Sequence, residues 1–193
     1  DKAEAALGDD RYEEAATGAQ IVLTQKTPRG VRLKALHILA WAALLQERID
    51  EAERATAQIR RETEPDPALA GAILLHKGAE AEARAIFEAA RARGDDRKEV
   101  VGPLIQLLIK QGEVARAAAT AFDIVDSLSS EDARQMADIA AEAQAFNWAA
   151  RLYESVFDRD GAPDDGYAAV RMRALDGDVP GALALLKRAV EAG

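Results

Sequence analysis

The sequence is poor in the side chains from which most active sites are built. It contains no cysteine, two histidines, four serines and a single asparagine, Asn147. The missing cysteine excludes disulfides, thiol nucleophiles, iron–sulfur clusters and thiolate zinc sites, while it leaves the compartment open. With so few histidines and serines, a nucleophilic triad has few ways to form. We therefore expect a protein that is not an enzyme and needs no cofactor.

Long hydrophobic runs and an excess of basic charge are also missing. No stretch of eighteen apolar residues could span a bilayer. The 25 basic and 34 acidic residues give a net charge of −9, which disfavours nucleic acid and anionic membranes because both attract basic surfaces. With 49% hydrophobic and 31% charged residues, the chain should fold. We expect a soluble protein that neither binds nucleic acid nor inserts into membranes.

The start of the chain and its amino-acid bias bear on the organism and the compartment from which the protein comes. The chain starts at Asp1 without an initiator methionine or a signal-peptide pattern, as expected for a fragment of a longer chain or for a mature form. Arginine outnumbers lysine and asparagine is nearly absent, a bias typical of GC-rich coding sequences. We expect a bacterial protein in the cytoplasm, with the periplasm left open.

What the sequence does contain predicts helices. Alanine, the strongest helix former, makes up close to a quarter of the chain, and apolar residues recur at three- and four-residue steps. Asp66 before Pro67 should cap a helix, and Ser129 with Asp132 should form a capping box. Pro103 either begins a short helix or lies inside a longer one that starts near Glu99. No strand-like alternation is sustained, so the fold class should be all-α.

One pattern recurs in six copies, in which an alanine is followed four and seven places later by residues that are apolar in all but one case. The leading alanines are separated by 37, 31, 34, 32 and 33 residues, a period of about 34. Five residues earlier a glycine stands in three copies, where a tight turn needs one, and small residues stand twelve places earlier in three copies, where two helices should approach closely. These positions are Ala15, Ala52, Ala83, Ala117, Ala149 and Ala182 for the alanines, Gly78, Gly112 and Gly177 for the turns, and Ala40, Gly71 and Ala137 for the close approaches.

The copy at 64–97, with Gly71, Leu74, Gly78, Ala83, Phe87 and Ala90, resembles the tetratricopeptide repeat family. Sel1-like, pentatricopeptide and HEAT repeats are the neighbouring families. The resemblance implies a right-handed α-α superhelix of about five to six helix-turn-helix repeats in a single domain, 1–193. It places a partial repeat at 1–29 and repeats at 30–63, 64–97, 98–129, 130–162 and 163–193. Ile105 and Val170 replace the usual small residue, and Gly8 lies two residues too far from Ala15, so we expect irregular packing there.

The resemblance also implies a binding surface, because the first helices of such repeats line a concave groove. That groove should bind an extended peptide or a helix of another protein, with acidic segments favoured by its arginines and lysines. Trp41 is either a peptide anchor or a core residue, and Trp148 either is exposed or folds back over the preceding loop. The inward residues carried over from the family are Lys34, His37, Trp41, Ala68, Ala72, His76, Gln106, Lys110, Arg134, Asp138, Tyr167 and Arg171.

The sequence also contains acidic clusters and histidines of the kinds found in metal sites, and it was compared with the carboxylate clamp of co-chaperone repeats. The acidic clusters at 9–13 and 95–99 have the spacing DDxxE of magnesium-binding synthases, but each follows a turn glycine, where aspartates should cap the next helix. The acidic turn at 158–165 departs from the register of a calcium loop, and the two histidines have no adjacent carboxylate, so no metal site is expected. The clamp of co-chaperone repeats for C-terminal carboxylates is absent, because no first helix carries an asparagine.

The last helix carries too wide an apolar arc for a capping helix, with Val179, Leu183, Leu186 and Val190 among its apolar residues. Either a further helix or another molecule should cover it, including a second copy. The alternatives to a groove-binding scaffold are therefore a regulatory domain of a larger protein and a self-assembly module.

Overall fold

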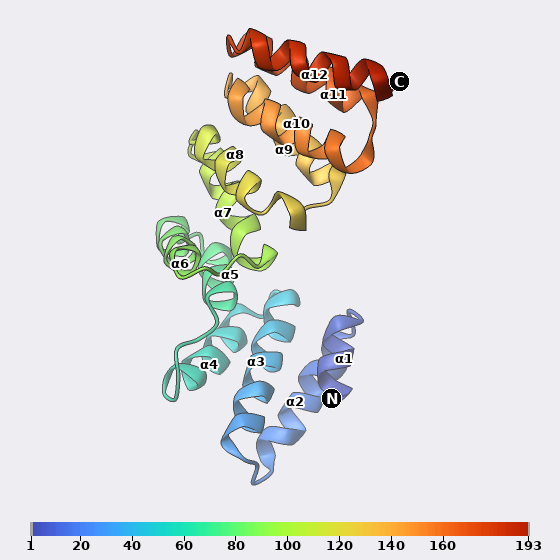
Figure 1. The fold of residues 1–193 in the computed structure, drawn as a ribbon. Helices are drawn as coiled ribbons and strands as arrows, with labels where there is room; N and C mark the ends of the chain where they lie inside the picture. The colour runs from blue at the N-terminus through green and yellow to red at the C-terminus, as the bar shows by residue number, and fades with distance from the viewer. Residues whose placement is uncertain (1, 193) are drawn as a thin grey trace. The chain divides into compact units, whose positions relative to one another are not determined.

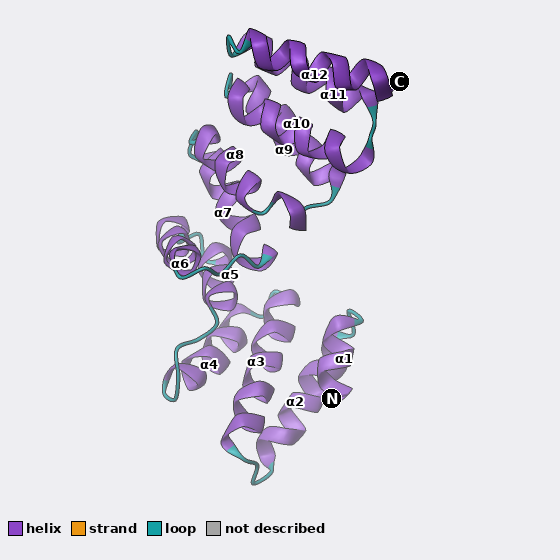
Figure 2. Cartoon of the chain, in the orientation of Figure 1, coloured by secondary structure: helices purple, strands orange, loops and turns teal. Residues whose placement is uncertain are grey.

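The computed structural model describes residues 2–192, and these form helices and loops without a strand (Figures 1 and 2). The all-α prediction is therefore confirmed for the described residues. The α-helices in chain order are α1 (Lys2–Gly8), α2 (Tyr12–Thr24), α3 (Arg29–Leu45), α4 (Ile49–Arg60), α5 (Pro67–His76), α6 (Glu80–Ala92), α7 (Lys98–Lys110), α8 (Val114–Asp123), α9 (Ser130–Glu142), α10 (Phe146–Asp160), α11 (Pro163–Leu175) and α12 (Val179–Ala192).

The helices pair as the repeat pattern predicts. The leading alanines lie on the second helix of each pair, where five of the six are fully buried and Ala182 is 6% exposed. Five residues before each leading alanine the backbone has a positive φ in all six turns. Three of these residues are the predicted glycines, and the others are Asp10, Glu47 and Gln144, with φ of 59°, 59° and 60°. Asp10 therefore stands at the turn position five residues before Ala15, which Gly8 does not occupy.

Each of the six turns is closed by the same backbone hydrogen bond. The amide that follows the positive-φ residue donates to a carbonyl in the last turn of the first helix, as in Ala79 to Leu74 at 2.9 Å and Ala145 to Ala140 at 2.8 Å. This is the six-to-one bond of a Schellman ending, which satisfies a carbonyl that the helix leaves unpaired. The repeats therefore share one turn geometry even where glycine is absent.

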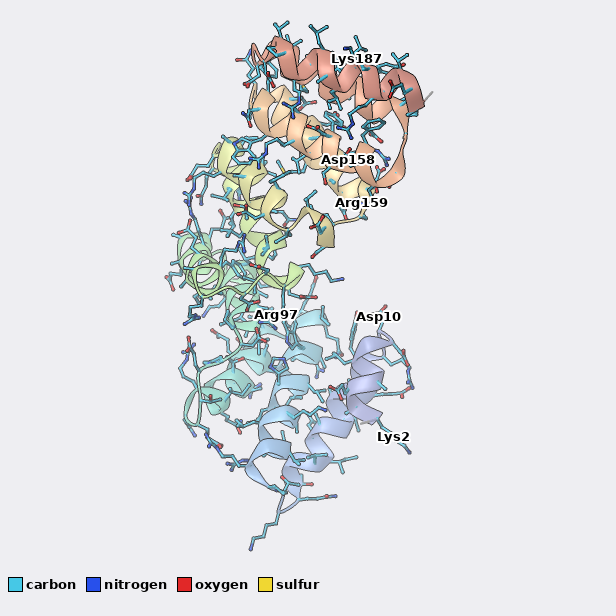
Figure 3. All side chains as sticks on the ribbon, viewed as in Figure 1. Lys2, Asp10, Arg97, Asp158, Arg159 and Lys187 are labelled. Atoms are coloured by element: carbon cyan, nitrogen blue, oxygen red, sulfur yellow. The ribbon has the colours of Figure 1, made fainter. Side chains whose placement is uncertain are left out.

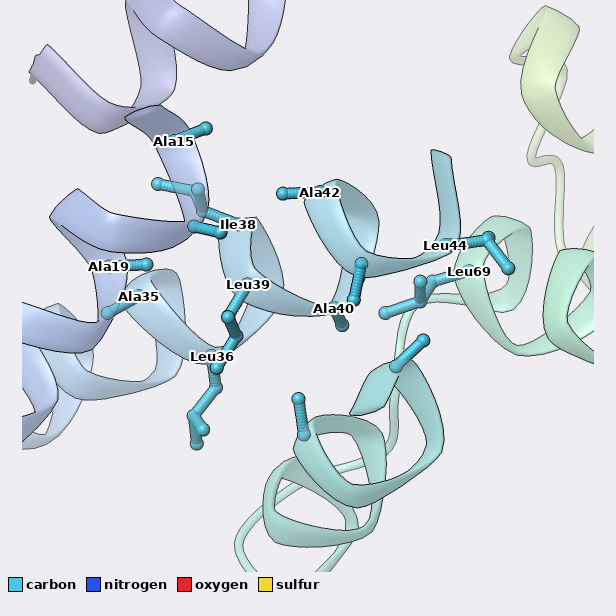
Figure 4. Packing of buried hydrophobic residues seen from close by; sticks show 14 of the residues in the cluster. Ala15, Ala19, Ala35, Leu36, Ile38, Leu39, Ala40, Ala42, Leu44 and Leu69 are labelled. Carbon is cyan, nitrogen blue, oxygen red and sulfur yellow. The ribbon is translucent and has the colours of Figure 1, made fainter. Parts of the chain in front are cut away.

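The chain divides into two compact units, residues 1–93 and residues 94–193. In the first unit α3 lies at the centre and packs against α1, α2, α4 and α5. Its buried face joins Leu36 and Ala40 to Ala15 of α2 and Leu69 of α5 in one apolar core (Figure 4). The division of 1–193 into repeats at the bounds given above, within a single domain, stays a prediction.

In the second unit α10 lies at the centre and packs against α8, α9 and α11, and α12 packs against α11 (Figure 1). Arg159, labelled in Figure 3, donates hydrogen bonds to the carbonyls of Leu128 at 2.6 Å and Val125 at 2.9 Å. These bonds satisfy loop carbonyls between α8 and α9, where Val125–Ser127 form a 3-10 turn. The long α8–α9 connection is thereby fixed to α10.

The predicted close approach at Gly71 is confirmed. A Cβ atom at this position of α5 would lie 2.3 Å from the ring of Phe87 on α6, and Phe87 is fully buried. Ala40 and Ala137, at the matching positions of α3 and α9, are also fully buried. Ile105 and Val170, which replace the small residue, are only partly buried.

The structure shows both predicted N-caps and places Pro103 inside a helix. Asp66 accepts the Ala68 amide at 2.8 Å, so this predicted cap is confirmed. Ser129 Oγ accepts the Asp132 amide at 3.0 Å, which is the N-cap half of the predicted capping box, and it donates to the Asp132 carboxylate at 2.6 Å. Pro103 lies inside α7, which begins at Lys98.

The acidic clusters after the turns do not cap helices, and that prediction is wrong. The N-cap residues of α2 and α7 are Arg11 and Arg97, and neither helix has a side-chain cap. Asp9 instead pairs with Arg11 at 3.1 Å, and Asp95 pairs with Arg97 at 2.7 Å. In each cluster the first aspartate thus binds the arginine two residues later, and Asp95 also accepts the backbone amide of Arg97 at 3.3 Å.

Candidate functional site

In the first unit Trp41 is neither a fully buried core residue nor a fully exposed peptide anchor. Its side chain is half-buried and packs against the apolar core, while its indole Nε1–H donates to Nε2 of His37 at 3.0 Å. His37 stands one turn earlier on α3, and the two rings meet edge to face with centroids 6.3 Å apart. A half-buried indole needs a partner for its N–H, and His37 supplies it within the same helix. Trp41 is thus positioned mainly by contacts within the unit.

The other predicted residues of the first unit lie at its surface. Lys34 of α3 is exposed and pairs with Glu4 of α1 at 2.6 Å. The hydrogen bond from Lys34, followed by its positive charge, lowers the pKa of Glu4. His76 is the last residue of α5 and is exposed, whereas Ala68 is buried and Ala72 is half-buried. Among residues 2–192 no hydrogen bond or ring contact joins His76 to Trp41 in one site.

In the second unit Arg134 of α9 is held by carboxylates. Its guanidinium donates to both carboxylate oxygens of Asp165 at 2.9 Å, and to Asp160 at 2.8 Å. Asp165 lies in the first turn of α11 and is only 6% exposed. Hydrogen bonding to Asp165 is the largest effect that raises the pKa of Arg134. Arg134 therefore ties α9 to α11 and to the end of α10.

Asp138, one turn further along α9, accepts a short hydrogen bond from the hydroxyl of Tyr153 on α10. Tyr153 is 7% exposed. Its burial, and after that the hydrogen bond to Asp138, raises the pKa of its hydroxyl, while the positive charge of Arg171 on α11 lowers it. Asp138, Tyr153 and Arg171 thus bring α9, α10 and α11 together electrostatically.

Tyr167 and Arg171 stand one turn apart on α11, and both are exposed; the tyrosine side chain is 43% exposed. Within residues 2–192 neither side chain has a hydrogen-bonding or ion-pair partner. Gln106 and Lys110, on α7, are exposed as well. Of the predicted residues on the first helices of the second unit, Arg134 is held by ion pairs, whereas Tyr167 and Arg171 form an exposed aromatic–arginine pair on α11.

The structure contains two hollows between neighbouring helices that the sequence did not predict. A cavity of about 1010 Å³ in the first unit lies between α4, α5 and α6, with Ala57, Ile73, Leu74 and Ile86 among its apolar lining. Thr56 also lines it, and its Oγ1 atom is buried without a hydrogen-bonding partner. A second hollow of about 710 Å³ lies beside α8 and α10 in the second unit. Their formation depends on the spacing of neighbouring helices, which no sequence motif specifies.

Trp148 lies beside the second of these hollows. It is half-buried and its ring lies 6.1 Å from that of Phe122 on α8. Arg151 covers both rings, with its guanidinium 3.9 Å from the centre of Phe122 and 4.6 Å from that of Trp148. Trp148 therefore packs against α8 as part of a cation–π cluster.

The structure assigns structural partners to the acidic residues that resembled a metal loop. Asp160 and Asp165 both pair with Arg134, and Asp158 pairs with Arg188 of α12. Among residues 2–192 there is no group of three or more histidines or acidic residues arranged to hold a metal ion. No helix in the same part of the chain is long and apolar enough to cross a bilayer.

Comparisons with known proteins support the fold. No family model and no curated protein matches the sequence. Among solved structures the chain is similar to MamA MSR-1 C2, with a TM-score of 0.50 and 15% identity, over 84% of this chain and 97% of that one. MamA is a tetratricopeptide-repeat-like protein, so the similarity supports a helical repeat fold of that kind. At this level of identity the likeness concerns the fold alone.

Proposed function

We propose that this protein is a noncatalytic scaffold that binds an extended acidic segment of another protein on the first-helix side of its second unit. The observation that carries the proposal is the exposed pair Tyr167 and Arg171 on α11. An arginine fork can bind a carboxylate with two hydrogen bonds, and a neighbouring tyrosine adds apolar area and a hydroxyl. Tyrosine and arginine are also the residues most enriched among binding hot spots.

The neighbouring contacts favour rigid presentation of this pair. Arg134 anchors the first turn of α11 through buried Asp165, and Gly166 packs against Phe157 of α10. A side chain carried by a fixed helix loses less freedom on binding than one on a mobile loop. In this interpretation Arg134 positions α11, and Arg171 contacts the partner.

The charge of this helix side favours an acidic partner. The charge of Arg134 is balanced by ion pairs with Asp165 and Asp160, whereas Arg171 forms no ion pair within the described residues. Its positive charge lies close enough to Tyr153 to lower the pKa of that hydroxyl. The whole chain carries a net charge of −9, so the attraction of Arg171 for a carboxylate acts at short range, where the guanidinium can bind it directly.

Selection from a random peptide library against the intact chain tests the proposal. Labelled selected peptides are then titrated by fluorescence anisotropy with the intact chain, Arg171→Glu and Tyr167→Ala. Lys26→Glu is the matched control, because Lys26 is exposed in the turn between α2 and α3 and the charge change is the same. We expect peptides rich in Asp and Glu, with affinity about tenfold lower for Arg171→Glu, or about 1.4 kcal/mol.

The control decides between a local contact and a general charge effect. Equal weakening by Lys26→Glu and Arg171→Glu would mean that net charge, and no site on α11, attracts the peptides. Peptides without acidic residues, or peptides that bind all variants equally, would refute the proposal.

A further inference from the structure

Helix α12 leaves a complete apolar stripe exposed. Val179, Leu183, Leu186 and Val190 follow one another at steps of four, three and four residues, which places them on one side of the helix. Their exposed fractions are 56%, 56%, 37% and 59%. A different side of α12, with Ala182, Leu185 and Ala189, is buried. The helix is therefore apolar on the side it buries and on a side that it leaves open.

The repeat register shows what this stripe does elsewhere in the chain. The leading alanines Ala149 and Ala182 are 33 residues apart, so the stripe of α12 corresponds to positions 146, 150, 153 and 157 of α10. Ala150, Tyr153 and Phe157 are 2%, 7% and 6% exposed. α10 packs against α11, and the Phe157 ring lies close to Gly166 of that helix. On α10 the end of the stripe, Phe157, thus packs against the next first helix, while the hydroxyl of Tyr153 donates to Asp138 of the preceding first helix, α9.

The second helix that ends the first unit gives the opposite case. In α6 the corresponding positions, counted from Ala83, hold Glu80, Arg84, Phe87 and Arg91, and only Phe87 is fully buried. Three of the four positions are therefore charged where a helix ends a compact unit. The four positions of α12 instead keep the apolar pattern of a helix that packs against a successor.

We propose that the exposed stripe of α12 is a docking site for an amphipathic α-helix of a partner protein, which lies antiparallel to α12 as α11 lies on α10. The stripe extends over eleven residue steps, or about 16 Å, which is three turns of a helix. The helix that occupies the equivalent place on α10 buries Gly166 and Ala169. A partner helix with small residues in the middle of its apolar side would approach α12 as closely.

The width of the stripe favours one helix over a second copy of the chain. A standard dimer interface buries about 800 Å² on each partner, with about 20–30 residues on each side. Four side chains in one row form a much narrower surface, which suits a single helix laid along it. Lys187 is exposed beside the stripe on α12 (Figure 3), so an acidic residue at the edge of the partner helix would have a cation to pair with.

A direct test appends the α11 sequence to the chain. Residue 193 corresponds to residue 160, so a copy of residues 161–176 added after residue 193 reproduces the spacing by which α11 follows α10. The covalent link gives the added helix a high effective concentration, which makes weak docking measurable. Methyl NMR spectra should show new environments for Leu183, Leu186 and Val190, with unchanged Leu152 and Val156 on α10. The free peptide 161–176 should compete weakly for the same methyl groups in the natural chain.

The matched variants are Leu183→Gln with Val190→Gln on the stripe, and Ile21→Gln as a control at an exposed apolar side chain of the first unit. Leu183 and Val190 are 56% and 59% exposed, so the variant should fold. We expect it to abolish the methyl shifts, while Ile21→Gln leaves them unchanged. Shifts of Leu152 and Val156 would mean that the added helix displaces α11 and would overturn the proposal. Absent shifts in the tethered chain, or concentration-dependent dimerisation of the natural chain that the stripe variant removes, would also overturn it.

Discussion

The contact between Gly71 and Phe87 allows a quantitative test of the repeat packing. In Gly71→Ala the new Cβ atom would lie 2.3, 2.4 and 2.9 Å from three atoms of the Phe87 ring. Phe87 is fully buried, so the ring cannot move into solvent. Overpacking of this kind costs about 1–3 kcal/mol. Because these contacts are far inside van der Waals distance, we expect a cost near the upper end, about 3 kcal/mol, of which alanine returns up to about 1 kcal/mol through its helix propensity, so the net loss should be about 2 kcal/mol.

The measurement is urea unfolding of the first unit, followed by Trp41 fluorescence in a Trp148→Phe background. Gly30→Ala is the control, because its Cβ would meet nothing within 4 Å, and it should be neutral or slightly stabilising. Phe87→Leu should partly rescue Gly71→Ala, so that the double variant is less destabilised than the sum of the single changes. A Gly71→Ala chain as stable as the natural one would refute the close approach.

Three further changes probe the second unit. Gln144→Gly should stabilise the chain by about 0.5–1 kcal/mol in urea unfolding, because Gln144 has a φ of 60°; destabilisation would contradict the turn geometry. Arg134→Leu should cost about 2 kcal/mol by leaving the buried carboxylate of Asp165 unpaired, whereas Arg134→Leu with Asp165→Leu should recover most of that loss. The raised pKa of Tyr153 means that its hydroxyl ionises first in the unfolded chain, so its contribution to stability should be constant below about pH 9 and fall above about pH 10. Tyr153→Phe should reduce that alkaline loss, and an unchanged pH profile would contradict the assignment.

The helical repeat could be predicted from the sequence because its signals are local. The spacing of the leading alanines and the small residue at Gly71 depend on helix geometry that a period of about 34 residues reveals. The turn at Gln144 was less predictable, since a non-glycine residue accepts a positive φ where the Schellman hydrogen bond holds it. That turn is identified by its position in the repeat, because glutamine itself has no preference for a positive φ.

The candidate site was predicted less completely, because its geometry depends on contacts between distant residues. Arg134 and Asp165 are 31 residues apart, and nothing local indicates that their side chains meet. The hydrogen bond from Trp41 to His37 spans one turn and could have been inferred from the spacing of four residues on one helix. The exposed Tyr167 and Arg171 were among the predicted groove residues, but their role in binding stays a proposal.

The most direct test of the proposed binding function is an NMR titration of the isotopically labelled chain with a selected acidic peptide. We expect saturable shifts of the Arg171 Nε–H signal and of the α11 amides near Tyr167, with the signals of the α4–α6 hollow unchanged. Shifts confined to that hollow, with the Arg171 signal unmoved at saturation, would contradict binding on the first-helix side of the second unit.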